Sequence, residues 1–128
     1  MITRETFDKQ VEAVLTKLPA EILRLLDEVP LHIEDQPLKR LMKELHLESG
    51  DELCGLFQGV SLNKKNEMHP RLPDSVTLFR RGILSQVADE YGKVSRRELR
   101  REIRITILHE YGHLHGLEED EIAALGYG

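Results

Sequence analysis

The sequence is almost devoid of cysteine and has no hydrophobic run long enough to cross a membrane. Cys54 is the single cysteine, so no disulfide can form within the chain and nothing favours an oxidising compartment. A membrane-spanning helix needs about 20 apolar residues, and no segment approaches that length. The first residues, MITRETFDKQ, include acidic side chains and no apolar stretch typical of a signal peptide. We therefore expect a cytoplasmic protein that does not bind membranes.

An excess of positive charge is also missing. The chain has 18 Lys and Arg against 23 Asp and Glu, a formal net charge of −5. Nucleic-acid binding needs a basic face, so nucleic acid is not expected as a partner. One local exception is SRRELRREIR, from Ser95 to Arg104, in which Glu98 and Glu102 lie among five arginines. We interpret it as a solvated helix face carrying i,i+4 ion pairs.

The sequence shows no repeat, no low-complexity run and no interdomain linker. Its 128 residues are enough for one domain with a real hydrophobic core. We therefore predict a single domain over residues 1–128.

Apolar residues at helical spacing predict several helices. The first extends from Thr3 to Leu18, and a second starts at Pro19, a favoured residue in a first helical turn. The segment PLKRLMKELHL predicts a third, with its leucines and Met42 on one side. The last and longest begins at Ser95, where Ser-Arg-Arg-Glu forms a capping box, and extends to about His115. Gly116 follows in the position where a left-handed residue ends a helix.

Strand patterns lie between these helices. Val29, Leu31 and Ile33 alternate with polar residues, and Pro30 favours a sheet edge. LCGLFQGVSL predicts a strand with a bulge or bend, and SVTLFRR predicts a β-branched strand. NKKNEMHPRLPD is typical of a loop, and GILSQVADEYGK is mixed, with at most a helical turn. Together these elements predict an α+β domain, a small sheet with helices packed against it.

The stretch TILHEYGHLHGLEED, in the last helix, carries the chemistry. His109 and His113 are four residues apart, so both imidazoles lie on one helix face and can reach one metal ion. Glu110 is turned about 100° from His109, which suits a base beside an activated water better than a ligand. Tyr111 is expected to point away from the helix face that carries the two histidines. Thr106 and Ile103 are expected in the core.

A third metal ligand is required, and the acidic tail offers candidates. In the extended pattern His-Glu-x-x-His-x-x-Gly-x-x-ligand, Gly116 matches the glycine and Glu119 occupies the ligand position. Asp120 is the alternative if the turn differs by one residue. The cofactor predicted from this set is Zn2+. Cys54 lies in an apolar segment with no neighbouring histidine, and we expect a buried, inert thiol.

At these residues the sequence resembles the minimal zincin-like bacterial metallopeptidases, short proteins with an extended His-Glu-x-x-His-x-x-Gly-x-x-Asp motif. VPLHIEDQP, LCGLFQGVSL, LPDSVTLFRRGIL and ALGY resemble family segments in the same order, so the resemblance covers roughly residues 7 to 127. It implies a zincin-like fold, with the active-site helix beneath a small mixed sheet. It also implies zinc at His109, His113 and an acidic third ligand, with Glu110 as general base. By position that ligand is Glu119, where the family usually has aspartate.

Two features of the larger metzincins are missing. Met1, Met42 and Met68 all precede the motif, so no methionine turn follows the third ligand. No downstream subdomain is expected to form the lower wall of a cleft. We therefore expect either a substrate held from one side, or a partner protein or a second copy that completes the cleft.

Three functions follow from these residues. The first is a zinc hydrolase, in particular a peptidase, with a peptide or protein substrate paired along an edge strand such as SVTLFRR. The second is a non-catalytic zinc-binding structural or interaction module of zincin-like fold. The third is a metal-free helix. The sequence favours the first.

Overall fold

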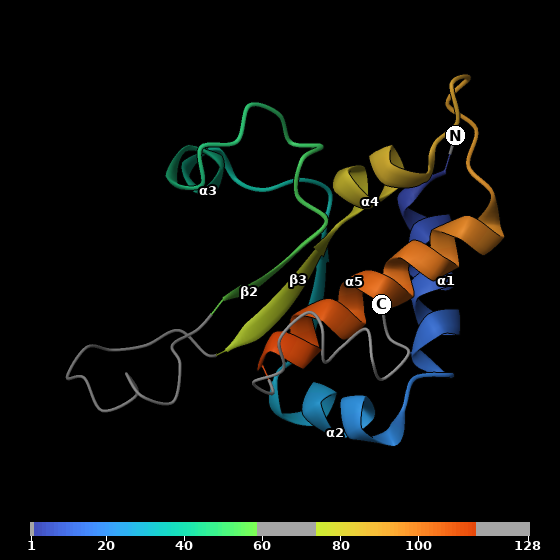
Figure 1. Cartoon of the computed structure of the whole chain (residues 1–128), viewed down its shortest axis with the longest axis vertical. Coiled ribbons are helices and arrows are strands. Elements are labelled where there is room, and N and C mark those ends of the chain that lie inside the picture. Colours follow the sequence, from blue (N-terminus) through green and yellow to red (C-terminus); the bar gives the residue numbers. More distant parts are fainter. Residues whose placement is uncertain (1, 59–73, 115–128) are drawn as a thin grey trace.

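Three short strands form a mixed sheet at the centre of the fold (Figure 1). The computed structural model describes residues 2–58 and 74–114 of the chain. Strand β3 (Ser75–Phe79) is central, with β1 (Leu31–Glu34) parallel to it on one side and β2 (Gly55–Gln58) antiparallel on the other. The small mixed sheet predicted from the sequence is confirmed.

The order of the strands corrects one prediction. Because β3 pairs on both sides, its backbone cannot also pair with a peptide substrate, and the edge-strand role suggested for SVTLFRR is wrong. The edges of this sheet are β1 and β2. Pro30 directly precedes β1, and its carbonyl accepts a hydrogen bond from the Val76 N–H at 3.0 Å. The edge position that Pro30 indicated for the first strand is confirmed.

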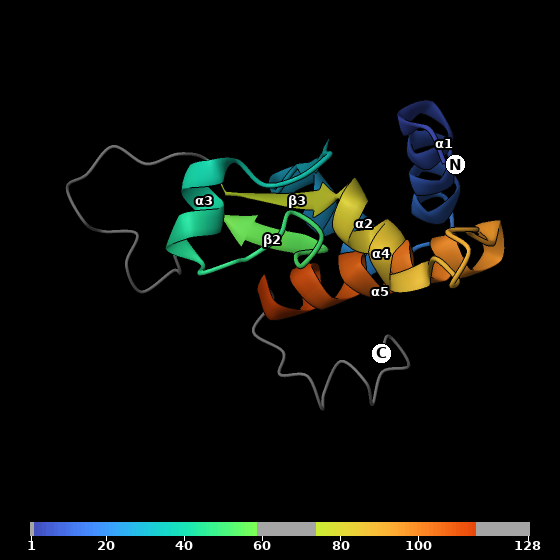
Figure 2. The same cartoon turned by 90° about the horizontal axis from the view of Figure 1, so that it is seen from above.

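Helix α5 (Arg96–Leu114) is the long C-terminal helix and packs on one face of the sheet (Figure 2). Ser95 starts it as predicted, since its Oγ accepts from the Glu98 N–H at 3.4 Å. Its apolar stripe is fully buried, and consists of Leu99, Ile103, Ile107, Leu108 and Tyr111. The predicted end at Gly116 lies outside the described residues.

Helices α1 (Arg4–Leu15) and α2 (Ala20–Glu28) supply the other side of the core. Thr3 caps α1, accepting a hydrogen bond from the Thr6 N–H at 3.1 Å. The predicted stripe is buried at Phe7, Val11, Val14 and Leu18, although the helix itself ends at Leu15. Both helices contact α5, so the motif helix packs against them as well as against the sheet.

Helix α4 (Arg80–Val87) starts directly after β3, in a segment expected to be partly strand and partly mixed. The sequence pattern does not reveal that α4 packs very closely against the chain that enters β2. A Cβ at Gly82 would lie 1.9 Å from the Leu53 carbonyl oxygen, so only glycine lets α4 pack against the chain entering β2. Gly82 therefore occupies a helical position at which alanine would have the higher helix propensity.

Helix α3 (Lys39–Glu44) is shorter than predicted and buries no residue. Leu38, at its N-cap, is 78% exposed and Leu45, at its C-cap, 41%. The helix stands apart from α5, beyond the sheet (Figure 2). Leu41 and Met42, also predicted on this side of the helix, are half-buried, so this apolar side is not part of the buried core.

The architecture is α+β, as the alternation of patterns predicted, with α5 on one sheet face and α3 on the other side. Within residues 2–58 and 74–114, no helix is long and apolar enough to span a membrane.

Candidate metal centre

The rotation of α5 about its axis determines which motif side chains reach solvent. Between Thr106 and Gly112, every residue is buried except His109 and Glu110, which are half-buried. Ile103 and Thr106 lie in the core as predicted, and the Thr106 hydroxyl donates to the Glu102 carbonyl at 2.8 Å. The apolar stripe thus turns the first histidine and the glutamate of the motif toward the surface.

Tyr111 locks this rotation from the opposite side of the helix. Its side chain is completely buried and its hydroxyl donates a 2.7 Å hydrogen bond to the carbonyl of Val29. Burial raises the pKa of Tyr111, so the phenol stays protonated and remains a donor. Two residues along a helix correspond to about 200°, so Tyr111 faces away from His109 as predicted.

Strand β2 lies directly against the motif helix at Gly55. A Cβ built there would be 2.7 Å from Thr106 Cγ2 and 3.4 Å from Glu110 Cγ. Because Gly55 has no side chain, β2 can approach α5 this closely. This edge strand therefore lies beside Glu110, the predicted general base. The sequence showed a glycine within a strand, a signal for a bulge or a close approach, but not the partner it approaches.

The remaining predicted ligands are only partly located. His113 falls within α5, one turn after His109, but its side chain lies outside the described residues. Glu119 and Asp120 lie outside them entirely. Within the described part of the chain, no three metal-binding side chains come together.

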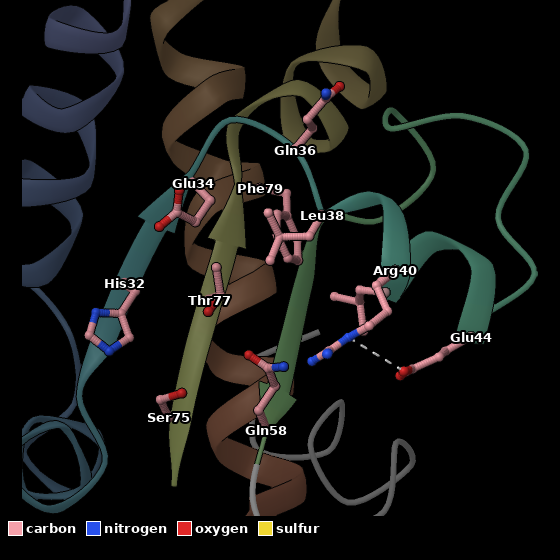
Figure 3. A pocket seen from close by; sticks show the side chains of 11 residues that line it. His32, Glu34, Gln36, Leu38, Arg40, Glu44, Gln58, Ser75, Thr77 and Phe79 are labelled. Atoms are coloured by element: carbon pink, nitrogen blue, oxygen red, sulfur yellow. Dashed lines mark ion pairs between the residues drawn. The ribbon is translucent and has the colours of Figure 1, made fainter. Parts of the chain in front are cut away.

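A cavity of about 500 Å³ lies on the other face of the sheet, beneath α3 (Figure 3). His32 and Glu34 of β1 and Thr77 of β3 line it, with α5 behind the sheet. At its rim, Arg40 and Glu44 of α3 form an ion pair, with 3.9 Å between Arg40 Nε and Glu44 Oε1. The cavity includes neither His109 nor Glu110, so it is separate from the candidate metal centre.

Cys54 is half-buried just before β2. Burial, together with the charge of Glu102, raises the pKa of its thiol to about 11. A raised pKa keeps the thiol protonated near neutral pH, which agrees with the inert thiol predicted, although Cys54 is less buried than expected.

Comparison with known proteins identifies the family. A family model described as a zincin-like metallopeptidase matches residues 26–128. The chain belongs to this family, whose name implies a zinc cofactor. No curated protein matches the chain. The match includes the whole sheet and α5 but starts within α2, later than the resemblance noted in the sequence.

The donor set fits zinc. His109 is an imidazole held at the surface by a buried helix, and the helix repeat places His113 one turn further on. Imidazole nitrogens and a carboxylate oxygen are ligands that zinc prefers. Glu110, the predicted general base, directly follows His109, and Gly55 lies close to its side chain.

Proposed function

We propose that this zincin-like protein is a zinc-dependent peptidase whose general base is Glu110. His109, His113 and an acidic residue, Glu119 or Asp120, would hold the metal. When bound, zinc supplies the Lewis acidity that makes water a nucleophile near neutral pH. Glu110 accepts the proton of the attacking water and later gives it to the leaving amine.

The observation that carries the proposal is the selective exposure of α5. Of the seven residues from 106 to 112, only His109 and Glu110 are not buried. These two accessible residues are the first histidine and the glutamate of the His-Glu-x-x-His motif. The family match supports the same chemistry.

Strand β2 is the edge on which we propose that a peptide substrate pairs. It is antiparallel to β3, its other side is not paired within the described sheet, and Gly55 brings it against Glu110. An extended peptide added to that edge would run past the general base, and its main chain would supply most of the binding. Strand β1, the other edge, lies on the far side of β3 from this residue.

The test is the substitution Glu110→Gln in the zinc-loaded protein. We expect zinc content and folding to be unchanged and cleavage of a peptide library to fall by about 100-fold or more, because the proton acceptor is lost. Glu98→Gln, which removes the same charge from an exposed position of α5, serves as the control and should leave cleavage unchanged.

Two results would count against the proposal. Cleavage that survives Glu110→Gln would show that another group takes the proton. A zinc-loaded wild-type protein that cleaves no peptide would instead favour the non-catalytic zinc-binding module.

A further inference from the structure

Helices α1 and α5 contact each other (Figures 1 and 2). A groove lined by five cationic side chains lies between the end of α1 and the N-terminal half of α5. Its volume is about 500 Å³. We call it the arginine groove, and its cations are Lys17, Arg97, Arg100, Arg101 and Arg104. Its other lining residues come from the end of α1 and are uncharged. The groove therefore concentrates positive charge on a chain whose net charge is −5.

No carboxylate of the described residues pairs with these cations. Arg100 donates to the Gln10 side-chain oxygen at 2.9 Å, which fixes one wall, but none of the five forms an ion pair. Glu98 and Glu102 each follow a groove arginine by one residue and are turned about 100° from it. Among the described residues no ion pair forms within SRRELRREIR, so the i,i+4 pairing predicted there is wrong.

Helix stability does not explain these arginines. They are spaced by three and four residues, so each has another arginine as a neighbour on the helix surface, and only Arg101 also has an acid there, Glu98 three residues before it. Like charges at these spacings destabilise a helix. Arg97, in the first turn of α5, is also opposed by the helix dipole, whose positive end lies there. A stripe of like charges that does not serve the helix points to a bound anion.

We propose that the arginine groove binds an acidic segment of another protein. Guanidinium groups form paired, charge-assisted hydrogen bonds with carboxylates. The four arginines of the groove lie along one side of α5, so several carboxylates of one extended peptide could each pair with a guanidinium group. The groove is open along the helix, because Arg97, Arg100 and Arg101 are all exposed. A peptide rich in aspartate and glutamate matches both the charge and the linear shape.

Nucleic acid fits the groove less well. No aromatic side chain lines it, so bases would find no stacking surface. A long polyanion would also extend beyond the groove over a chain that is negative as a whole, where it is repelled. A short acidic segment avoids that repulsion. The proposal is independent of zinc, since the groove includes none of the motif residues.

The experiment measures binding of a short fluorescent peptide of aspartate and glutamate to the full chain by fluorescence anisotropy. We expect binding that weakens as salt is raised. The double substitution Arg97→Gln with Arg101→Gln should weaken it by about tenfold, since two charge-assisted contacts are lost. Arg24→Gln with Arg40→Gln removes the same charge from outside the groove and should change affinity by less than about twofold.

A thermal melt of the same variants separates binding from folding. The groove variant should be at least as stable as the wild type, because like charges are removed from α5. A lower melting temperature would show that the arginines serve the fold and would overturn the proposal. Equal weakening by the control pair, or tighter binding of a single-stranded oligonucleotide of the same charge, would also overturn it. So would salt-dependent self-association that the groove variant abolishes, because the occupant would then be a second copy.

Discussion

At the scale of the residue, Tyr111 joins the motif helix to the chain leaving α2. Substituting Tyr111→Phe keeps the buried ring but removes the donor to the Val29 carbonyl. We expect a loss of about 1–2 kcal/mol in the free energy of unfolding, because a buried acceptor loses its partner. Chemical denaturation measures this loss.

Tyr91 provides the matched control. Its side chain is 80% exposed, so Tyr91→Phe removes the same hydroxyl without changing a buried contact. Equal stabilities for the two variants would mean that the Tyr111 hydrogen bond contributes nothing to holding α5.

Single residues also show what a sequence reveals about a site. The helical period was sufficient to predict that Ile103 and Thr106 face inward and that Tyr111 faces away from His109. It could not predict that Gly55 approaches Glu110, because that contact joins residues more than fifty positions apart. The positions of Glu119 and Asp120 remain predictions, since both lie outside the described residues.

At the scale of the element, Asp35 ties three segments together. It follows β1, and its carboxylate pairs with Arg80 at the start of α4 at 2.8 Å and with Arg4 at the start of α1 at 3.3 Å. Its main-chain oxygen accepts from the Arg81 N–H at 3.0 Å. The hydrogen bond from Arg80, more than any other contact, lowers the pKa of Asp35.

A lowered pKa means that the ionised carboxylate stabilises the fold above the ordinary aspartate value and loses that effect as pH falls through the lowered one. We expect Asp35→Asn to reduce the free energy of unfolding at neutral pH by at most about 1 kcal/mol, because the side chain is half exposed. The difference from wild type should shrink below pH 3.8. Denaturation at several pH values measures it.

Asp27→Asn, an exposed position on α2, serves as the control and should not change stability. A difference between Asp35→Asn and wild type that persists unchanged at low pH would contradict an electrostatic origin.

Elements with a strong local signal were predicted well and those defined by distant contacts were not. Helix α5 was predicted from its spacing and from Ser95, because both are properties of the segment itself. The central place of β3 depends on which strands pair with it, and α4 depends on the fit of Gly82 against Leu53. Neither relation is visible in a local pattern.

At the scale of the whole molecule, zinc should couple to stability. A ligand that binds only the folded state raises the free energy of unfolding, by about 2.7 kcal/mol when its free concentration is one hundred times Kd. We expect added zinc to raise the melting temperature and a chelator to reverse the rise. His109→Ala should abolish the zinc-dependent shift.

His32→Ala removes an exposed imidazole from β1 and should leave the zinc-dependent shift intact. A shift that persists in His109→Ala would locate the stabilising zinc elsewhere in the molecule.

The part of this chain that sequence comparison recognises is smaller than the part that shields the motif helix α5 from water. The family match begins at residue 26, whereas Phe7, Val11 and Val14 of α1 belong to the same buried cluster as Leu99 and Ile103. A protein trimmed to the recognisable region would retain every motif residue and yet expose the back of α5. Domain limits for expression should therefore follow the hydrophobic contacts of the N-terminal helix rather than the boundaries of homology.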